Sequence, residues 1–222
     1  MSTATSDRRS LRTRRALREA LAAEIAAMGE LGNVTVTGLC ARADITRRTF
    51  YFHYKDIPDL VDAVEQEALE ALAPLVAGIA RTNLDELEEA ISSFRPCPGS
   101  VELISWFETE GADLGALLGE GGDPAFAEKI KAMVREVVER RALEGFSSLA
   151  FPLFDYYLTY AISAEVGVIA RWLTTGMRES AEEMGCIMTA LMFVRPGDLY
   201  GRHLSFDLIS AAKAAMSAVK EA

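Results

Sequence analysis

The sequence predicts an all-α protein, and three observations carry that prediction. Apolar residues recur at spacings of three and four through most of the 222 residues, as one face of a helix requires. Alanine, leucine and glutamate, which favour helices, dominate the chain. The nearest approach to a strand, residues 34–37, is too short and leads directly into a helical pattern. We therefore expect a bundle of helices and no sheet.

The first predicted helix covers residues 10–28. Four apolar residues at spacings of four, four and three form its inward stripe: Leu17, Leu21, Ile25 and Met28. Gly29 and Gly32 follow, and glycine is the residue that most often ends a helix. The sequence therefore predicts a long helix whose inner face packs against the segment that follows.

Two short helices are predicted next, over residues 36–43 and 47–54. Thr35 and Thr46 precede them, and a threonine hydroxyl at this position accepts a hydrogen bond from an amide of the first turn. Because the two caps are close in sequence, both helices must be short and the connection between them tight.

The remaining pattern is a further series of helices. One begins near Pro58, buries one face and meets Pro74, which is expected to bend or break it. That face is formed by Leu60, Val64, Ala68, Leu72, Leu75 and Ile79. The later helices are expected over residues 84–93, 101–110, 113–118, 124–142, 152–175, 180–193 and 205–219.

Charge divides the chain at about residue 55. Residues 1–55 hold ten Lys and Arg against five Asp and Glu, a net charge of +5, whereas residues 56–222 hold thirteen against twenty-eight, a net charge of −15. The overall charge of −10 therefore conceals a basic head on an acidic body. A basic segment with a binding architecture is the electrostatic signature of nucleic-acid contact. We predict a head of residues 1–55 and a body of residues 56–222.

Several classes of protein find no support in the sequence. No apolar run approaches the roughly 20 residues that span a bilayer, and residues 1–15 lack the apolar core of a signal peptide, so we expect a cytoplasmic protein without membrane contact. Cys40, Cys97 and Cys186 have neither disulfide nor metal-site spacing, and we expect no metal and no cofactor. With two histidines and no phosphate-loop pattern, catalysis has no candidate residues, so we expect no enzyme.

The head has the outline of a helix-turn-helix, whose third helix enters the major groove of DNA. Arg47, Arg48 and Thr49 occupy the first turn of that helix, the end that meets the bases. The planar fork of arginine can bind guanine or a phosphate through two hydrogen bonds. Further along, Tyr51, His53 and Lys55 can donate to backbone phosphates and fix the register.

Residues 35–56, TVTGLCARADITRRTFYFHYKD, resemble the DNA-binding signature of the tetracycline-repressor (TetR) family. The family pattern is roughly T-V-x-x-I-A-x-x-A-G-V-S-x-x-T-F-Y-x-H-F, followed by a lysine and a leucine. The matching residues are Thr35, Val36, Leu39, Ala43, Ile45, Thr46, Thr49, Phe50, Tyr51, His53, Tyr54 and Leu60. Asp44 replaces the turn glycine, Cys40 a common alanine, and Ile57 a lysine that contacts phosphate, a contact that Lys55 can supply instead.

The resemblance implies a DNA-binding transcriptional regulator that is a cytoplasmic homodimer bound to double-stranded operator DNA. We expect it to be a repressor, although repression or activation depends on where the operator lies relative to the promoter. It assigns DNA contacts to Thr35, Thr46, Arg47, Arg48, Thr49, Tyr51, His53 and Lys55. Residues 117–126 and 164–173 are similar to stretches in the subgroup that includes regulators of dihydroxyacetone-kinase operons. The five arginines of residues 8–15 are either a solvated tail or an arm that reaches phosphates or the minor groove.

In the body, the resemblance implies a dimer interface and a site for an unidentified small-molecule effector. Small residues at three-residue spacing permit close helix approach, and the interface is expected at Ala161, Ala164, Gly167, Ala170, Ile187, Ala190 and Leu191. An apolar effector cavity with polar handles is expected at Trp106, Phe126, Tyr157 and Tyr160.

Two other interpretations remain open at this point. In one, the body binds a protein partner in place of a small molecule. In the other, the chain is an α-helical enzyme whose head resembles the family by accident, which leaves the basic head unexplained.

Overall fold

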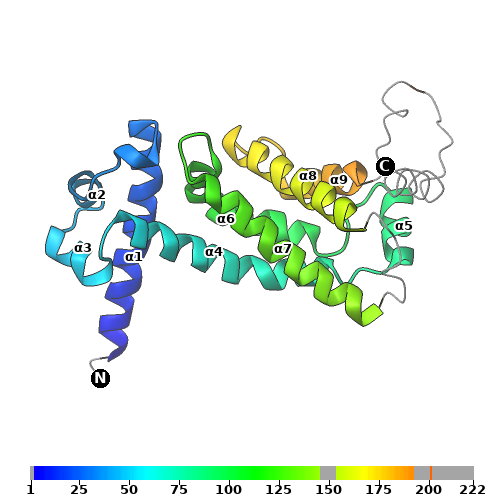
Figure 1. Ribbon diagram of the computed structural model, residues 1–222, viewed down its shortest axis with the longest axis horizontal. Coiled ribbons are helices and arrows are strands. Elements are labelled where there is room, and N and C mark those ends of the chain that lie inside the picture. Colours follow the sequence, from blue (N-terminus) through cyan, green and yellow to red (C-terminus); the bar gives the residue numbers. More distant parts are fainter. Residues whose placement is uncertain (1–2, 146–153, 193–200, 202–222) are drawn as a thin grey trace, which may run out of the picture.

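The structure, a computed structural model, describes residues 3–145, 154–192 and 201. Within these ranges the chain is helical and has no strand, so the predicted all-α class is confirmed. Figure 1 shows an elongated molecule with three helices at one end and the other helices stacked beyond them. The three are α1 (Thr3–Met28), α2 (Val36–Arg42) and α3 (Arg47–His53), with the short 3-10 helix η1 (Leu31–Asn33) between the first two.

Both predicted caps of the short helices are present. The Thr35 hydroxyl accepts a hydrogen bond from the Gly38 amide at 3.1 Å, and the Thr46 hydroxyl accepts one from the Thr49 amide at 3.1 Å. The turn between the helices contains Asp44, whose φ of 52° lies in the left-handed region. Aspartate tolerates this region better than most residues, so the turn keeps its shape without the glycine that the family pattern has there.

The three helices enclose a small core. Leu17, Leu21 and Ile25 of α1 are buried as predicted and pack with Leu39 and Phe50. Met28, the fourth residue of the predicted stripe, is half exposed, so its assignment to the core is wrong. The stripe ends early because Met28 is the last residue of α1, and the chain turns away at Gly29, whose φ is +75°.

Helix α4 (Ile57–Ile79) runs from these three helices into the rest of the molecule (Figure 1). The Asp56 carboxylate caps it by accepting a hydrogen bond from the Asp59 amide at 2.9 Å. The helix continues through Pro74, so the prediction of a break at this proline is wrong. Pro74 is exposed, whereas Leu72 and Ala68, two and six residues earlier, are buried, so packing of the inner face holds the helix together across the missing hydrogen bond.

The other helices are α5 (Leu84–Ser92), α6 (Ser100–Leu118), α7 (Pro124–Gly145), α8 (Phe154–Thr174) and α9 (Ala181–Leu191). Two helices were expected over residues 101–118, but α6 is one continuous helix. Gly111 at its centre does not end it, because this glycine is buried against α8, where a Cβ atom would lie 2.6 Å from Leu173. The helix predicted over residues 205–219 lies outside the described residues.

Helix α6 is the central element of the body. It packs against α1, α4, α7, α8 and α9, and its buried residues include Ile104, Phe107, Leu114 and Leu117. The head and body therefore meet at two places, through the continuous α4 and where α1 lies against α6. Beside the second contact, the Leu31 amide donates to the Gly121 carbonyl at 2.7 Å. A Cβ atom at Gly121 would lie 2.2 Å from the Gly29 carbonyl oxygen, so only glycine permits this approach.

Candidate nucleic-acid interface

Helix α3 presents polar and aromatic side chains outward and one anchor inward. Phe50 is fully buried, whereas Arg47, Arg48, Tyr51 and Phe52 are exposed. Thr49 and His53 are half-buried at the edges of the outer face, and Lys55 is exposed just beyond the helix. Thr46 is exposed at the start of α3, and Thr35 is exposed at the start of α2. The structure thus places seven of the eight predicted DNA-contact residues on or beside α3 and the eighth on the neighbouring helix.

The two arginines of the first turn differ in their surroundings. The Arg47 guanidinium donates to the Thr37 hydroxyl of α2, and this bond ties the two short helices together. Within the described residues, no hydrogen bond or ion pair is found for the Arg48 guanidinium. Arg48 is therefore available for an external acceptor, whereas Arg47 must exchange its bond to Thr37 before it contacts DNA directly.

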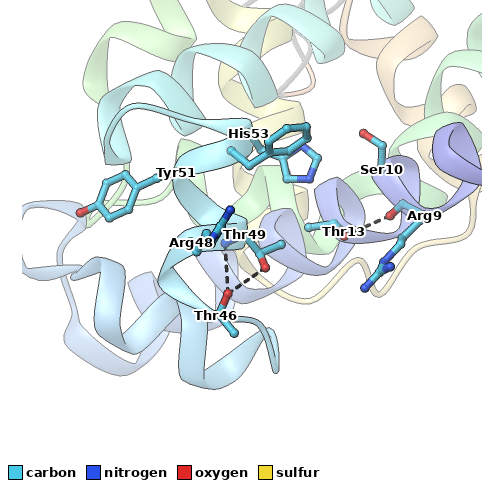
Figure 2. Close-up of a pocket in the computed structure, with 9 residues that line it drawn as sticks. Arg9, Ser10, Thr13, Thr46, Arg48, Thr49, Tyr51 and His53 are labelled. Carbon is cyan, nitrogen blue, oxygen red and sulfur yellow. Dashed lines mark hydrogen bonds between the residues drawn. The ribbon is translucent and has the colours of Figure 1, made fainter.

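A groove of about 590 Å³ lies between the start of α1 and the outer face of α3. Figure 2 shows side chains from both helices around it. It is lined by Arg9, Ser10, Thr13, Thr46, Arg48, Thr49, Tyr51, Phe52 and His53. Guanidinium and hydroxyl groups are the donors that proteins use for phosphate oxygens. The groove therefore has the chemistry of a binding site for the sugar–phosphate backbone.

Sequence reasoning missed Ser10, Thr13 and Phe52 in this groove. Ser10 and Thr13 are three residues apart and share one face of α1. This spacing is already visible in the predicted helix of residues 10–28, but only the packing shows that this face lies beside α3. Phe52 falls at an unspecified position of the family pattern, so the resemblance gave it no role. Only the packing of Phe50 inward shows which way Phe52 points.

His53 is held in its uncharged form near neutral pH. Partial burial is the main cause that lowers its pKa below the ordinary 6.5, and the nearby positive charge of Arg14 lowers it further. Its ring contacts that of Phe52 edge to face, with centroids 5.2 Å apart. In the free protein His53 therefore offers an N–H donor without a charge, and a bound phosphate would itself raise the pKa of the ring.

The predicted dimer residues lie on outward faces of α8 and α9. Ala164 and Gly167 are exposed and Ala161 and Ala170 are partly exposed on α8, while Ile187, Ala190 and Leu191 are exposed on α9. No atom lies within 4 Å of a Cβ built at Gly167, so this face of α8 is open. The surface is available for a second subunit, and its role as the dimer interface stays a prediction.

The comparisons with known proteins concern both halves of the chain. Residues 97–193 match the family model TetR_C_8, described as a transcriptional regulator C-terminal region. The fold is similar to the crystal structure of a TetR transcriptional regulator from Streptococcus agalactiae 2603V, with a TM-score of 0.54 and 19% identity over 87% of this chain and 100% of that chain. Both findings relate the chain to TetR-type transcriptional regulators, the family model through 97 of its 222 residues and the solved structure through its fold. A search of curated proteins gave no match. Membership of the dihydroxyacetone-kinase subgroup stays a prediction.

No helix among the described residues combines the length and the apolar character that a bilayer crossing requires.

The four predicted effector residues have different surroundings in the body. Phe126 is fully buried, and Trp106 is partly buried with its ring 5.1 Å from that of Phe107. Tyr157 and Tyr160 are 51% and 73% exposed on the outer face of α8, the face that carries Gly167. The two tyrosines therefore point away from the core that encloses Phe126, and the effector role of the four stays a prediction.

A groove that the sequence did not indicate lies at the far end of the body, beside α5. Its volume is about 530 Å³, within the range of small-molecule sites. The walls come from α5, the segment 95–99, the start of α6 and the start of α9, and four of the lining residues are glutamates: Glu86, Glu89, Glu102 and Glu182. Arg95 forms an ion pair with Glu89 at 2.5 Å. These residues are far apart in sequence, so only the packing of α5 and α9 reveals the groove.

Glu165 of α8 should make the stability of the body depend on pH. Burial raises its pKa from 4.5 to about 7, so the folded state keeps a proton that the unfolded chain has lost between these values. Stability must therefore fall as pH rises through this window. We expect Glu165→Gln to abolish that fall and to raise the free energy of unfolding by about 1–2 kcal/mol near pH 8, with little change near pH 5.

Urea denaturation at the two pH values measures this difference. Glu88→Gln, at an exposed position of α5, is the matched control and should leave the difference between the two pH values as it is in the wild type. A Glu165→Gln protein that is less stable than the wild type near pH 8 would contradict the expectation.

Proposed function

We propose that the protein represses transcription as a homodimer, with residues 1–55 as its DNA-binding head and residues 56–222 as its regulatory and dimerisation body. The observation that carries the proposal is the outer face of α3, where Arg47, Arg48 and Tyr51 project from a capped helix anchored by buried Phe50. Two such helices related by a two-fold axis would contact two half-sites of a nearly palindromic operator, about one helical turn apart or somewhat more.

The experiment that tests DNA binding begins with an unbiased pool of duplexes. The full-length protein is used to select from duplexes with about 20 randomised central base pairs, and the affinity for the selected sequence is measured by fluorescence anisotropy across a salt series. We expect an inverted repeat and a steep decrease of affinity with salt, since each neutralised phosphate releases counterions. Enrichment of no sequence, with equal weak binding to any duplex, would contradict the proposal.

We also propose that a small molecule bound in the body controls operator affinity. The groove beside α5 supports this proposal, because it offers suitable volume and charged groups. Linkage requires that an effector which weakens DNA binding is itself bound less tightly by the DNA-bound protein, by the same factor. Screening compounds for a change of anisotropy on the selected duplex finds the effector, and repression is checked by a reporter gene with that sequence at its promoter.

A further inference from the structure

Phe52 is a large apolar side chain that the protein leaves almost entirely in water. It is 84% exposed, and its ring contact with His53 is at the surface of the head. The core of the head is complete without it, because Phe50 and Tyr54 supply the buried aromatic rings of this segment. Packing of the single chain therefore gives no reason for a phenylalanine here.

Helix geometry places Phe52 on the outermost line of α3. Each residue advances about 100° around a helix, so Arg48, two residues before Phe50, and Phe52, two residues after it, each point about 160° away from Phe50 and lie about one turn from each other. Since Phe50 points into the core, these two side chains point most directly away from it. Any duplex that receives α3 in its major groove meets Arg48 and Phe52 first.

The chemistry of DNA limits what can cover an apolar ring at this position. Phosphates and most base-edge groups in the major groove are polar, and a phenyl ring can neither donate to them nor accept from them. The exception is the 5-methyl group of thymine, which projects into the major groove. Arg48, one turn away, can at the same time bind a neighbouring guanine or phosphate.

We infer that Phe52 determines base specificity by packing on a thymine 5-methyl group in each operator half-site. This inference rests on the proposed DNA-binding function and adds to it a residue and the base that the residue recognises. The polar contacts of the groove between α1 and α3 would hold the backbone, and Phe52 would supply discrimination that those contacts lack.

The test removes the methyl group and nothing else. In the duplex selected by the wild-type protein, each thymine is replaced in turn by deoxyuridine, which pairs identically but lacks the methyl. We expect one thymine per half-site at which the replacement weakens binding about fourfold, the equivalent of about 0.8 kcal/mol for one buried methyl group. Replacement in both half-sites should weaken binding about fifteenfold.

The variants identify the side chain that senses the methyl. Phe52→Ala should bind the thymine and deoxyuridine duplexes equally, while Phe52→Leu should keep part of the preference. Because the ring is exposed, thermal unfolding of both variants should match the wild type. Phe94→Ala, which removes a 90% exposed phenyl ring from a position outside the head, is the matched control and should keep the full preference.

Three outcomes would overturn the inference. One is a selected sequence whose binding is unaffected by deoxyuridine at every thymine, or one that has no thymine, with sequence-specific binding intact. The second is a Phe52→Ala protein that keeps the wild-type preference for thymine. The third is a wild-type protein that selects no sequence at all. In that case the proposed function fails together with the inference, whereas in the first two outcomes sequence-specific binding persists.

Discussion

Replacing Arg48 with alanine is expected to weaken binding to the selected duplex roughly 10- to 100-fold. Arg48 lies on the outer face of α3, opposite the buried Phe50, and borders the groove between α1 and α3. Its side chain has no role in the core of the head, so the thermal unfolding of the variant should match that of the wild type. Fluorescence anisotropy across a salt series measures the loss and its salt dependence.

Arg48→Lys separates the two ways in which this arginine can act. A lysine keeps the charge but loses the planar fork that binds two acceptors at once. If Arg48 contacts a base, the lysine variant keeps the salt slope and loses selectivity between duplexes. If Arg48 contacts only phosphate, the lysine variant resembles the wild type in both respects.

Arg140→Ala is the matched control for the change in charge. Arg140 is exposed on α7 in the body and forms an ion pair with Glu136 of the same helix. Its removal should leave DNA affinity nearly unchanged. An equal loss of affinity in Arg48→Ala and Arg140→Ala would mean that overall charge, and not the position on α3, decides binding.

Replacing Arg18 with methionine is expected to lower the free energy of unfolding by about 3 kcal/mol. Arg18 of α1 pairs with Glu110 at 2.8 Å and with Asp113 at 3.0 Å, both on α6, and its side chain is only 15% exposed. It also donates to the Glu110 carbonyl at 3.3 Å. Methionine preserves much of the apolar stem, so the loss reports chiefly the two carboxylates left without their cation. Calorimetry should show a decrease in Tm of about 5–10 °C.

The loss should be greater near pH 8 than near pH 5. Burial raises the pKa of Asp113 above its ordinary value, and the charge of Arg18 is the main influence that lowers it. Without Arg18 the folded-state pKa rises further above the unfolded-state value. The deprotonated carboxylate then costs stability as the pH rises through that interval. Denaturation of both proteins at the two pH values measures the difference.

Arg15→Met is the control on the same helix. Arg15 pairs with Glu19 at 2.8 Å, but its side chain is 83% exposed. Solvent screens such a pair, so the variant should unfold close to the wild type. Equal stability of all three proteins would show that the contact between α1 and α6 does not hold the head on the body.

The local features of the head were predictable because they depend on neighbours in sequence. Thr35 and Thr46 cap the helices that follow them, since a cap needs only a hydroxyl and the amides three residues on. The outward placement of Arg47, Arg48 and Tyr51 follows from the same short-range geometry. The errors arose where distant packing overruled local preference. Pro74 and Gly111 predict breaks, but inner faces packed against other helices keep α4 and α6 continuous.

The buried charged residues were also not predictable from local sequence patterns. In the sequence, Glu65 of α4 looks like a glutamate on a solvated helix face. In the structure it is 1% exposed and pairs with Lys129 of α7. Arg18 was unremarkable in sequence, yet it joins α1 to α6. In each case the partner lies more than sixty residues away, so no local pattern can indicate it.

By itself the sequence determined the helical class, the capped short helices and the side chains that α3 can present to DNA, because these depend on contacts within about one helical turn. The tertiary structure decided which faces meet: α1 on α6 through Arg18, the walls of the groove beside α5, and the burial of Phe50 in the core of the head. Burial and ion pairing between distant segments follow from how the whole chain excludes water, and each such choice depends on all the helices at once.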